Sequence, residues 1–215
     1  MLLKEPAFSA VVTNARTYLN ESIDLDPDQS VDEYTEVASS LHQIGAFDEA
    51  ARIFELLVKR FADAPAYEDA VRDGRRWAAL CYRDAGGMLD ASKRFEALIN
   101  DFPRWMVVRR DVAVCYESDV LKRYADAEKQ WRVVEDNYEM GGPEWFEARF
   151  HRIRNLAYQN RNDLAYQMLA AIAVPYPNLG GEPWEKQFLA LVRDTFTEEQ
   201  MRQFEVLRNE VHVEE

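Results

Sequence analysis

A near-copy of one short segment, displaced by about 34 residues, constrains the fold more than any other feature of this sequence. The segment at 78–82 (AALCY) recurs at 112–116 (VAVCY). A fixed period of this length is typical of helical solenoids, in which each repeat is a pair of helices that buries its apolar face against its neighbours. The period therefore predicts an all-α chain built from stacked helix-turn-helix repeats.

Around this period the sequence resembles the tetratricopeptide repeat (TPR) family. The family pattern places an aromatic residue before a Leu-Gly pair and a Tyr in the first helix, and Ala, an aromatic residue and Pro in the second. The matching residues are Tyr34, Val37, Ala38, Leu41, Ala50 and Phe54 in the first repeat, Ala78, Ala79, Tyr82, Ala91, Phe95, Leu98 and Pro103 in the second, Val112, Ala113, Tyr116, Ala127 and Trp131 in the third, and Ala165, Leu169, Ile172 and Pro177 in the fourth.

The resemblance implies a right-handed solenoid of about four repeats with a helical cap at each end. We expect the repeats at 31–65, 72–103, 106–141 and 143–177, an N-terminal capping helix and acidic turn at 1–30, and two capping helices at 178–215. Pro183 suits the first turn of one C-terminal helix. Thr197 and Gln200 have the spacing of a capping box at the start of the other.

The sequence departs from the family pattern at four places, and these departures affect the structure that we expect. Arg75 stands where the large aromatic residue belongs. The long connection Asp63–Asp73 is expected to lengthen the next helix, and Asp119–Arg123 is an insertion in a turn; both are candidate contact surfaces. In the fourth repeat the family register would bury Arg152, which is costly for an unpaired charge. We instead expect an apolar stripe on the first helix of this repeat to be buried, and we leave its register in the family pattern open. The stripe consists of Phe146, Phe150, Ile153 and Ala157.

Composition excludes several classes of function. A formal charge of -13 argues against nucleic acid and anionic membranes as partners, because both need a basic surface. No run approaches the ~18 apolar residues of a membrane span, and no signal-peptide core follows Met1. We expect a cytoplasmic protein, or a periplasmic one if a signal peptide was removed. The short basic clusters Arg109-Arg110 and Arg149 to Arg154 are interpreted as groove or ion-pair residues.

No motif for catalysis, a cofactor or a metal ion is present, so we expect a non-enzyme without cofactors. His42, His151 and His212 are scattered along the chain. Cys81 and Cys115 occupy matching positions of successive repeats, which are small and buried in the family, and we interpret them as core residues. The tryptophans are interpreted as core filling; they are Trp77, Trp105, Trp131, Trp145 and Trp184.

The resemblance also implies a binding site. In the family, the first helix of each repeat lines a concave groove that takes an extended peptide or a partner helix. Guanidinium groups there would bind carboxylates in bidentate geometry, which favours an acidic or amphipathic segment as ligand. The alternative is a solvated face whose arginines are neutralised by Asp73, Asp84 and Glu147. The groove positions are Thr35, Ser39, His42, Arg76, Leu80, Arg83, Arg110, Val114, Glu117, Phe150 and Arg154.

The sequence thus favours a protein-protein interaction scaffold or adaptor that captures a segment of a partner protein in its groove. A structural subunit or self-assembling scaffold, with homo-oligomers, is the main alternative. A cell-envelope assembly factor is another, because the ends of the first two repeats resemble those of envelope-associated repeat proteins. An enzyme is the class that the sequence favours least.

Overall fold

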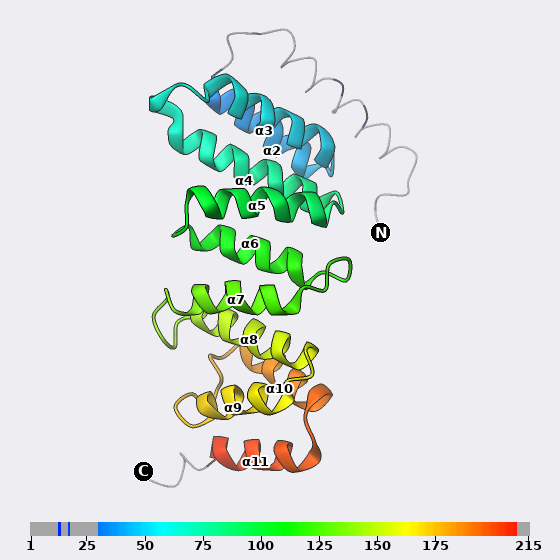
Figure 1. Ribbon diagram of the computed structural model, residues 1–215, viewed down its shortest axis with the longest axis vertical. Coiled ribbons are helices and arrows are strands. Elements are labelled where there is room, and N and C mark those ends of the chain that lie inside the picture. The colour runs from blue at the N-terminus through cyan, green and yellow to red at the C-terminus, as the bar shows by residue number, and fades with distance from the viewer. Residues whose placement is uncertain (1–12, 14–16, 18–29, 210–215) are drawn as a thin grey trace. The chain divides into compact units, whose positions relative to one another are not determined.

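The computed structural model describes Thr13, Thr17 and residues 30–209, and these residues form helices, turns and loops (Figure 1). Apart from Thr13 and Thr17, the predicted N-terminal capping helix lies outside this part, as do residues 210–215. The helices are α2 (Val31–Gln43), α3 (Phe47–Phe61), the one-turn η2 (Pro65–Tyr67), α4 (Glu68–Asp84), α5 (Met88–Asp101), α6 (Met106–Glu117), α7 (Tyr124–Glu135), α8 (Pro143–Tyr158), α9 (Asn162–Ala173), α10 (Trp184–Thr195) and α11 (Glu198–Asn209).

The chain forms two compact units, Met1–Pro103 and Arg104–Glu215, called unit 1 and unit 2 below. In unit 1, α2 packs on α3, α3 on α4, and α4 on α5 (Figure 1). In unit 2, α6 packs on α7, α7 on α8, and α8 on α9. From α2 to α5 in unit 1 and from α6 to α9 in unit 2, each helix therefore packs on the next one in the chain.

The core of unit 1 forms where small and aromatic residues alternate at helical spacing. Ala38 of α2 and Ala50 of α3 are completely buried, and such short side chains let two helices approach closely. The rings of Tyr34 and Phe54 are also buried beside them. Gly45 turns the chain between the two helices with φ +77°, a conformation that side chains other than glycine rarely adopt.

The connection at 63–73 lengthens the next helix, as expected, because its residues from Glu68 on belong to α4. Pro65 opens η2, and α4 begins directly after it at Glu68, several residues before the predicted start of the second repeat. Gly74 allows the lengthened helix to lie against α3, because a Cβ atom there would stand 3.1 Å from the side chains of Leu57 and Val58.

The insertion at 119–123 is a turn between α6 and α7. The Arg123 amide donates a hydrogen bond of 2.7 Å to the Tyr116 carbonyl, and Lys122 takes φ 48°. Val120 at its tip is exposed. The extra residues are thus taken up in a compact turn, and both flanking helices keep their packing.

At the end of unit 2, α10 packs on α8 and α11 packs on α9. The loop before α10 inserts Leu179 into the core, and Gly180 lies so close to the Phe146 ring that a Cβ atom would stand 2.5 Å from it. The predicted capping box is confirmed. The Gln200 amide donates to Thr197 Oγ1 (3.2 Å), and the Thr197 amide donates to Gln200 Oε1 (3.1 Å).

Cys81 and Cys115 are free and completely buried, which agrees with their interpretation as core residues. Burial, followed by the negative charge of Asp84, raises the pKa of the Cys81 thiol to about 12. Over the residues that the structure describes, none of the helices is long and apolar enough to cross a membrane. The same residues contain no group of three or more potential ligands that could hold a metal ion.

Candidate partner-binding site

The predicted groove residues of unit 1 come from α2 and α4, and we call them the α2/α4 surface: Thr35, Ser39 and His42 with Arg76, Leu80 and Arg83. The carboxylate of Asp84 contacts side chains from both helices of this surface. Asp84 accepts from His42 Nε2 at 2.9 Å through one oxygen and pairs with Arg83 at 2.9 Å through the other. The charge of Arg83 is therefore balanced within the unit.

Leu80 is a core residue rather than an apolar anchor, because only 6% of it is exposed. Ser39 is half-buried, and the Thr35 hydroxyl donates to the Val31 carbonyl one turn earlier. On α4, the predicted groove residues that can make polar contacts with a partner are therefore Arg76 and Arg83.

Trp77 adds an aromatic surface that the sequence analysis missed, since we interpreted this residue as core filling. Its ring stacks on Phe54 with centroids 6.0 Å apart, yet 39% of the residue is exposed. His42 meets the ring edge at 5.9 Å, and the Arg76 guanidinium lies 6.0 Å from its centroid. The sequence offered one sign that Trp77 would reach this surface. It directly follows the predicted groove residue Arg76, and successive side chains in a helix are only about a quarter turn apart.

In unit 2 the predicted residues come from α6 and α8 and form what we call the α6/α8 surface: Arg110, Val114 and Glu117 with Phe150 and Arg154. Arg110 pairs with Glu147 at 2.5 Å, with both side chains partly exposed. Val114, one turn further along α6, is 39% exposed. An apolar side chain thus stands beside a guanidinium group whose counter-ion is on α8.

Glu117 is the centre of a buried polar cluster. Its carboxylate accepts hydrogen bonds from Trp131 Nε1 (2.8 Å), His151 Nδ1 (2.9 Å), Arg154 Nη2 (2.6 Å) and Asn155 Nδ2. Burial raises the pKa of Glu117, but the hydrogen bonds and charges of these partners outweigh burial and leave the pKa below its ordinary value. The cluster joins α6, α7 and α8, so its donors serve packing.

Phe150 does not line an open surface. It is 6% exposed, and its ring packs against Phe188 (5.3 Å) and Trp184 (5.9 Å) of α10. Helix α10 covers this position, which periodicity within α8 could not show. Of the three apolar groove residues that we predicted, Val114 is the exposed one.

Ion pairs between α7 and α8 resolve the register of α8. The predicted stripe is buried, with Phe146, Phe150 and Ile153 in the core of unit 2. Arg152 is largely covered, with 13% of its side chain exposed, and it pairs with Glu128 and Glu135 of α7 at 3.0 Å each. The objection to burying Arg152 therefore fails, because the charge is compensated.

The remaining basic clusters are also paired. Arg149 binds Glu135 at 2.7 Å and lies 4.8 Å over the Trp145 ring, and Arg109 donates to Gln130 at 2.7 Å. The ion pairs of Arg149 with Glu135 and of Arg154 with Glu117 agree with the interpretation of these clusters as groove or ion-pair residues, whereas the Gln130 amide that Arg109 contacts is neutral.

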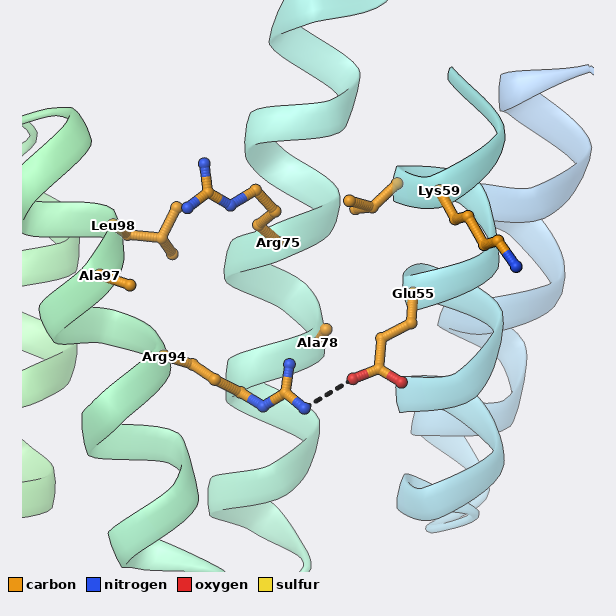
Figure 2. Close-up of a pocket in the computed structure, with 8 residues that line it drawn as sticks. Glu55, Lys59, Arg75, Ala78, Arg94, Ala97 and Leu98 are labelled. Carbon is orange, nitrogen blue, oxygen red and sulfur yellow. Dashed lines mark ion pairs between the residues drawn. The ribbon is translucent and has the colours of Figure 1, made fainter. Parts of the chain in front are cut away.

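A pocket of about 360 Å³ opens between α3, α4 and α5 in unit 1 (Figure 2). Arg75 and Ala78 of α4 form its floor, and Arg94 extends from α5 toward Glu55 of α3. The Arg94–Glu55 ion pair is 2.7 Å long. The sequence analysis identified only the departure at Arg75 and predicted no pocket.

Comparisons with known proteins support the fold. No family model matches the sequence, and no curated protein matches it. The chain is similar to the crystal structure of "putative kinesin light chain nearly identical TPR-like repeats" from Podosopora anserina, with a TM-score of 0.60 at 13% identity over 85% of this chain and 97% of that chain. A crystal structure of that protein with one residue substituted gives a TM-score of 0.60 at 12% identity over 85% and 96%.

This chain therefore has the fold of TPR-like helical-repeat proteins, and the predicted all-α repeat architecture is confirmed. Identities of 13% and 12% establish a shared fold and nothing further. The division into four repeats with a cap at each end stays a prediction.

Proposed function

We propose that this protein is a non-enzymatic protein-interaction scaffold, and that the α2/α4 and α6/α8 surfaces each bind a segment of a partner protein. The observation that carries the proposal is on the α6/α8 surface. There the exposed side chain of Val114 lies one turn from Arg110, whose guanidinium group is held in place by Glu147. The α2/α4 surface offers a similar combination, with exposed Trp77 beside Arg76.

The ion pairs determine how such a segment binds. A carboxylate of the partner would approach Arg110 and take over part of its bonding from Glu147, which remains nearby as a competing anion. Because partly exposed ion pairs contribute only about 0–1 kcal/mol, this exchange costs little and also gains little. Affinity then depends mainly on apolar contact with Val114 or Trp77, and charge supplies orientation and selectivity.

The Glu117–His151 pair does not argue for catalysis. Its carboxylate is buried and accepts four hydrogen bonds from side chains on α7 and α8, and His151 stacks on Trp131 with centroids 4.2 Å apart. Groups held this firmly within the packing of three helices serve stability. This supports a scaffold over an enzyme.

A test begins with a peptide library displayed on phage and selected on the immobilised full chain. We expect enrichment of sequences that combine acidic with apolar residues. The selected peptides are then measured against the variant Arg76→Glu, Arg83→Glu, Arg110→Glu, after its helicity has been matched to the wild type. We expect affinity to fall by about tenfold or more, because the substituted arginines of whichever surface binds the peptide change from attracting its carboxylates to repelling them.

The control is a variant with the same change in net charge at exposed positions away from both surfaces: Arg104→Glu, Arg161→Glu, Arg193→Glu. It should bind the peptides like the wild type at physiological salt. Equal loss in both variants would show general attraction of anions and refute the assignment of the surfaces. Unchanged binding in the first variant would refute it as well.

A second candidate, a self-assembling subunit, is favoured by an apolar hollow of about 500 Å³ between α9 and α11, which is lined by Tyr166, Arg202, Gln203, Val206 and Leu207. Val206 is exposed there. Light scattering over a range of concentrations distinguishes the two, because an adaptor should keep the mass of one chain.

A further inference from the structure

The pocket between α3, α4 and α5 lies on a different face of α4 from the α2/α4 surface. Arg75 and Ala78 share one helical face, whereas Arg76 and Arg83 share another. The pocket has small or aliphatic walls, from Val58, Ala78, Ala97 and Leu98, and a polar frame, from Glu55, Lys59, Arg75 and Arg94. A volume of about 360 Å³ places it at the small end of ligand pockets.

The first helix pair of the same unit shows what normally fills such a space. Tyr34 precedes the small pair at 37–38 by three residues, as Arg75 precedes the pair at 78–79. The Tyr34 ring is buried, meets Phe61 edge-on at 6.2 Å, and has the Arg60 guanidinium 5.9 Å from its centroid. In the first pair, then, the position holds an aromatic ring with an arginine against it.

The second helix pair has Arg75 in place of the ring. The Arg75 guanidinium group pairs at 2.6 Å with Asp101, which occupies the position that Arg60 has in the first pair. From α5, Arg94 lies 4.1 Å over the Tyr82 ring and pairs with Glu55. Figure 2 shows the Arg75 guanidinium group next to Leu98 and the Arg94 guanidinium group below Ala78, directed toward Glu55.

We propose that this pocket binds an aromatic side chain of a partner protein, with an indole ring as the best fit. The flat apolar face of the ring would lie on Ala78 and Ala97, and the edges of the site place guanidinium groups where they can contact its π-electrons. The Glu55 carboxylate, which also accepts from the Tyr82 hydroxyl at 3.1 Å, provides an acceptor for the indole N–H. The partner ring completes the packing that Tyr34 provides within the chain.

The test is a titration of the ¹⁵N-labelled full chain with N-acetyl-tryptophanamide, followed by amide chemical shifts. We expect saturable shifts that are confined to α3, α4 and α5, and an affinity about tenfold weaker for N-acetyl-leucinamide, which lacks a π-system. Absence of saturable shifts up to the solubility of the amide would overturn the proposal. Equal affinity for the two amides would overturn the assignment to aromatic rings.

Two variants test whether the tryptophan amide binds in the pocket. Ala97→Leu fills it from an exposed position of α5, and Arg75→Tyr restores the ring that the first helix pair has. Each should weaken binding of the tryptophan amide by about tenfold or more, because the ring and the new side chain need the same space. The matched control is Ala171→Leu, at an exposed alanine of α9 in unit 2, which should leave binding unchanged. Wild-type affinity in Ala97→Leu would refute the site even if Arg75→Tyr failed to fold.

Discussion

Removal of the largely covered charge of Arg152 gives the sharpest test of how α7 and α8 are held together. The change is Arg152→Met, which keeps the length and most of the volume of the side chain. In the wild type the guanidinium group serves two buried carboxylates, Glu128 and Glu135, whose side chains are 6% and 5% exposed. The variant therefore leaves two buried negative charges with less compensation.

The magnitude follows from what remains around each carboxylate. Breaking a buried ion pair costs about 3–5 kcal/mol when the other charge is left alone. Here Glu128 keeps Arg132 at 3.0 Å, and Glu135 keeps Arg149 at 2.7 Å. We therefore expect the free energy of unfolding to fall by about 2–3 kcal/mol, below the full cost of an isolated buried charge.

A double-mutant cycle with Glu128→Gln identifies the cause. If uncompensated charge is responsible, the double variant should be more stable than the sum of the single changes predicts, by about 1–2 kcal/mol. The measurement is urea unfolding followed by far-ultraviolet circular dichroism, fitted to the transition that contains unit 2. Arg193→Met, at an exposed arginine paired with its neighbour Asp194, is the control and should change stability by less than about 0.5 kcal/mol.

Two results would refute this reasoning. A loss below about 0.5 kcal/mol in Arg152→Met would mean that the glutamates are solvated or neutralised by other means. Strict additivity in the cycle would show that the side chain acts through packing alone.

Three further outcomes follow from single sites. Because the pKa of Glu117 is lowered, its contribution to stability is present above its ordinary value of 4.5 and is lost as pH falls through the lower folded-state value, so acid unfolding should be less steep in Glu117→Gln. Gly180→Ala should lower the free energy of unfolding by about 2–4 kcal/mol, because the new Cβ atom would clash with Phe146. Gly45→Ala has open space at its Cβ and should lower it by about 1–2 kcal/mol, because of the positive φ alone. The same urea assay measures both. Cys81 has a pKa of about 12 and is completely buried, so at mildly alkaline pH it should react with a thiol reagent only after unfolding. Mass spectrometry of the labelled chain locates the modified cysteine. Rapid labelling of the native protein at Cys81 would contradict its burial.

The sequence alone was sufficient for the features that depend on nearby residues. The repeat period and the small residues Ala38 and Ala50 predicted helices that pack in pairs, and the structure contains them. Thr197 and Gln200 predicted the start of α11, because a capping box is formed by residues three apart. Hydrogen bonds and periodicity within a helix are encoded locally, so inspection of the sequence recovers them.

The tertiary structure decided which helical faces are covered and how charges are balanced. Phe150 and Leu80 had groove positions, but the structure buries both, Phe150 beneath α10. Arg152 could be accepted as a buried residue only once Glu135, 17 residues earlier, was placed against it. The pocket beside Arg75 likewise exists because that side chain reaches Asp101, 26 residues away. Burial and charge compensation depend on side chains from other helices, and helical periodicity carries no information about which of these will meet.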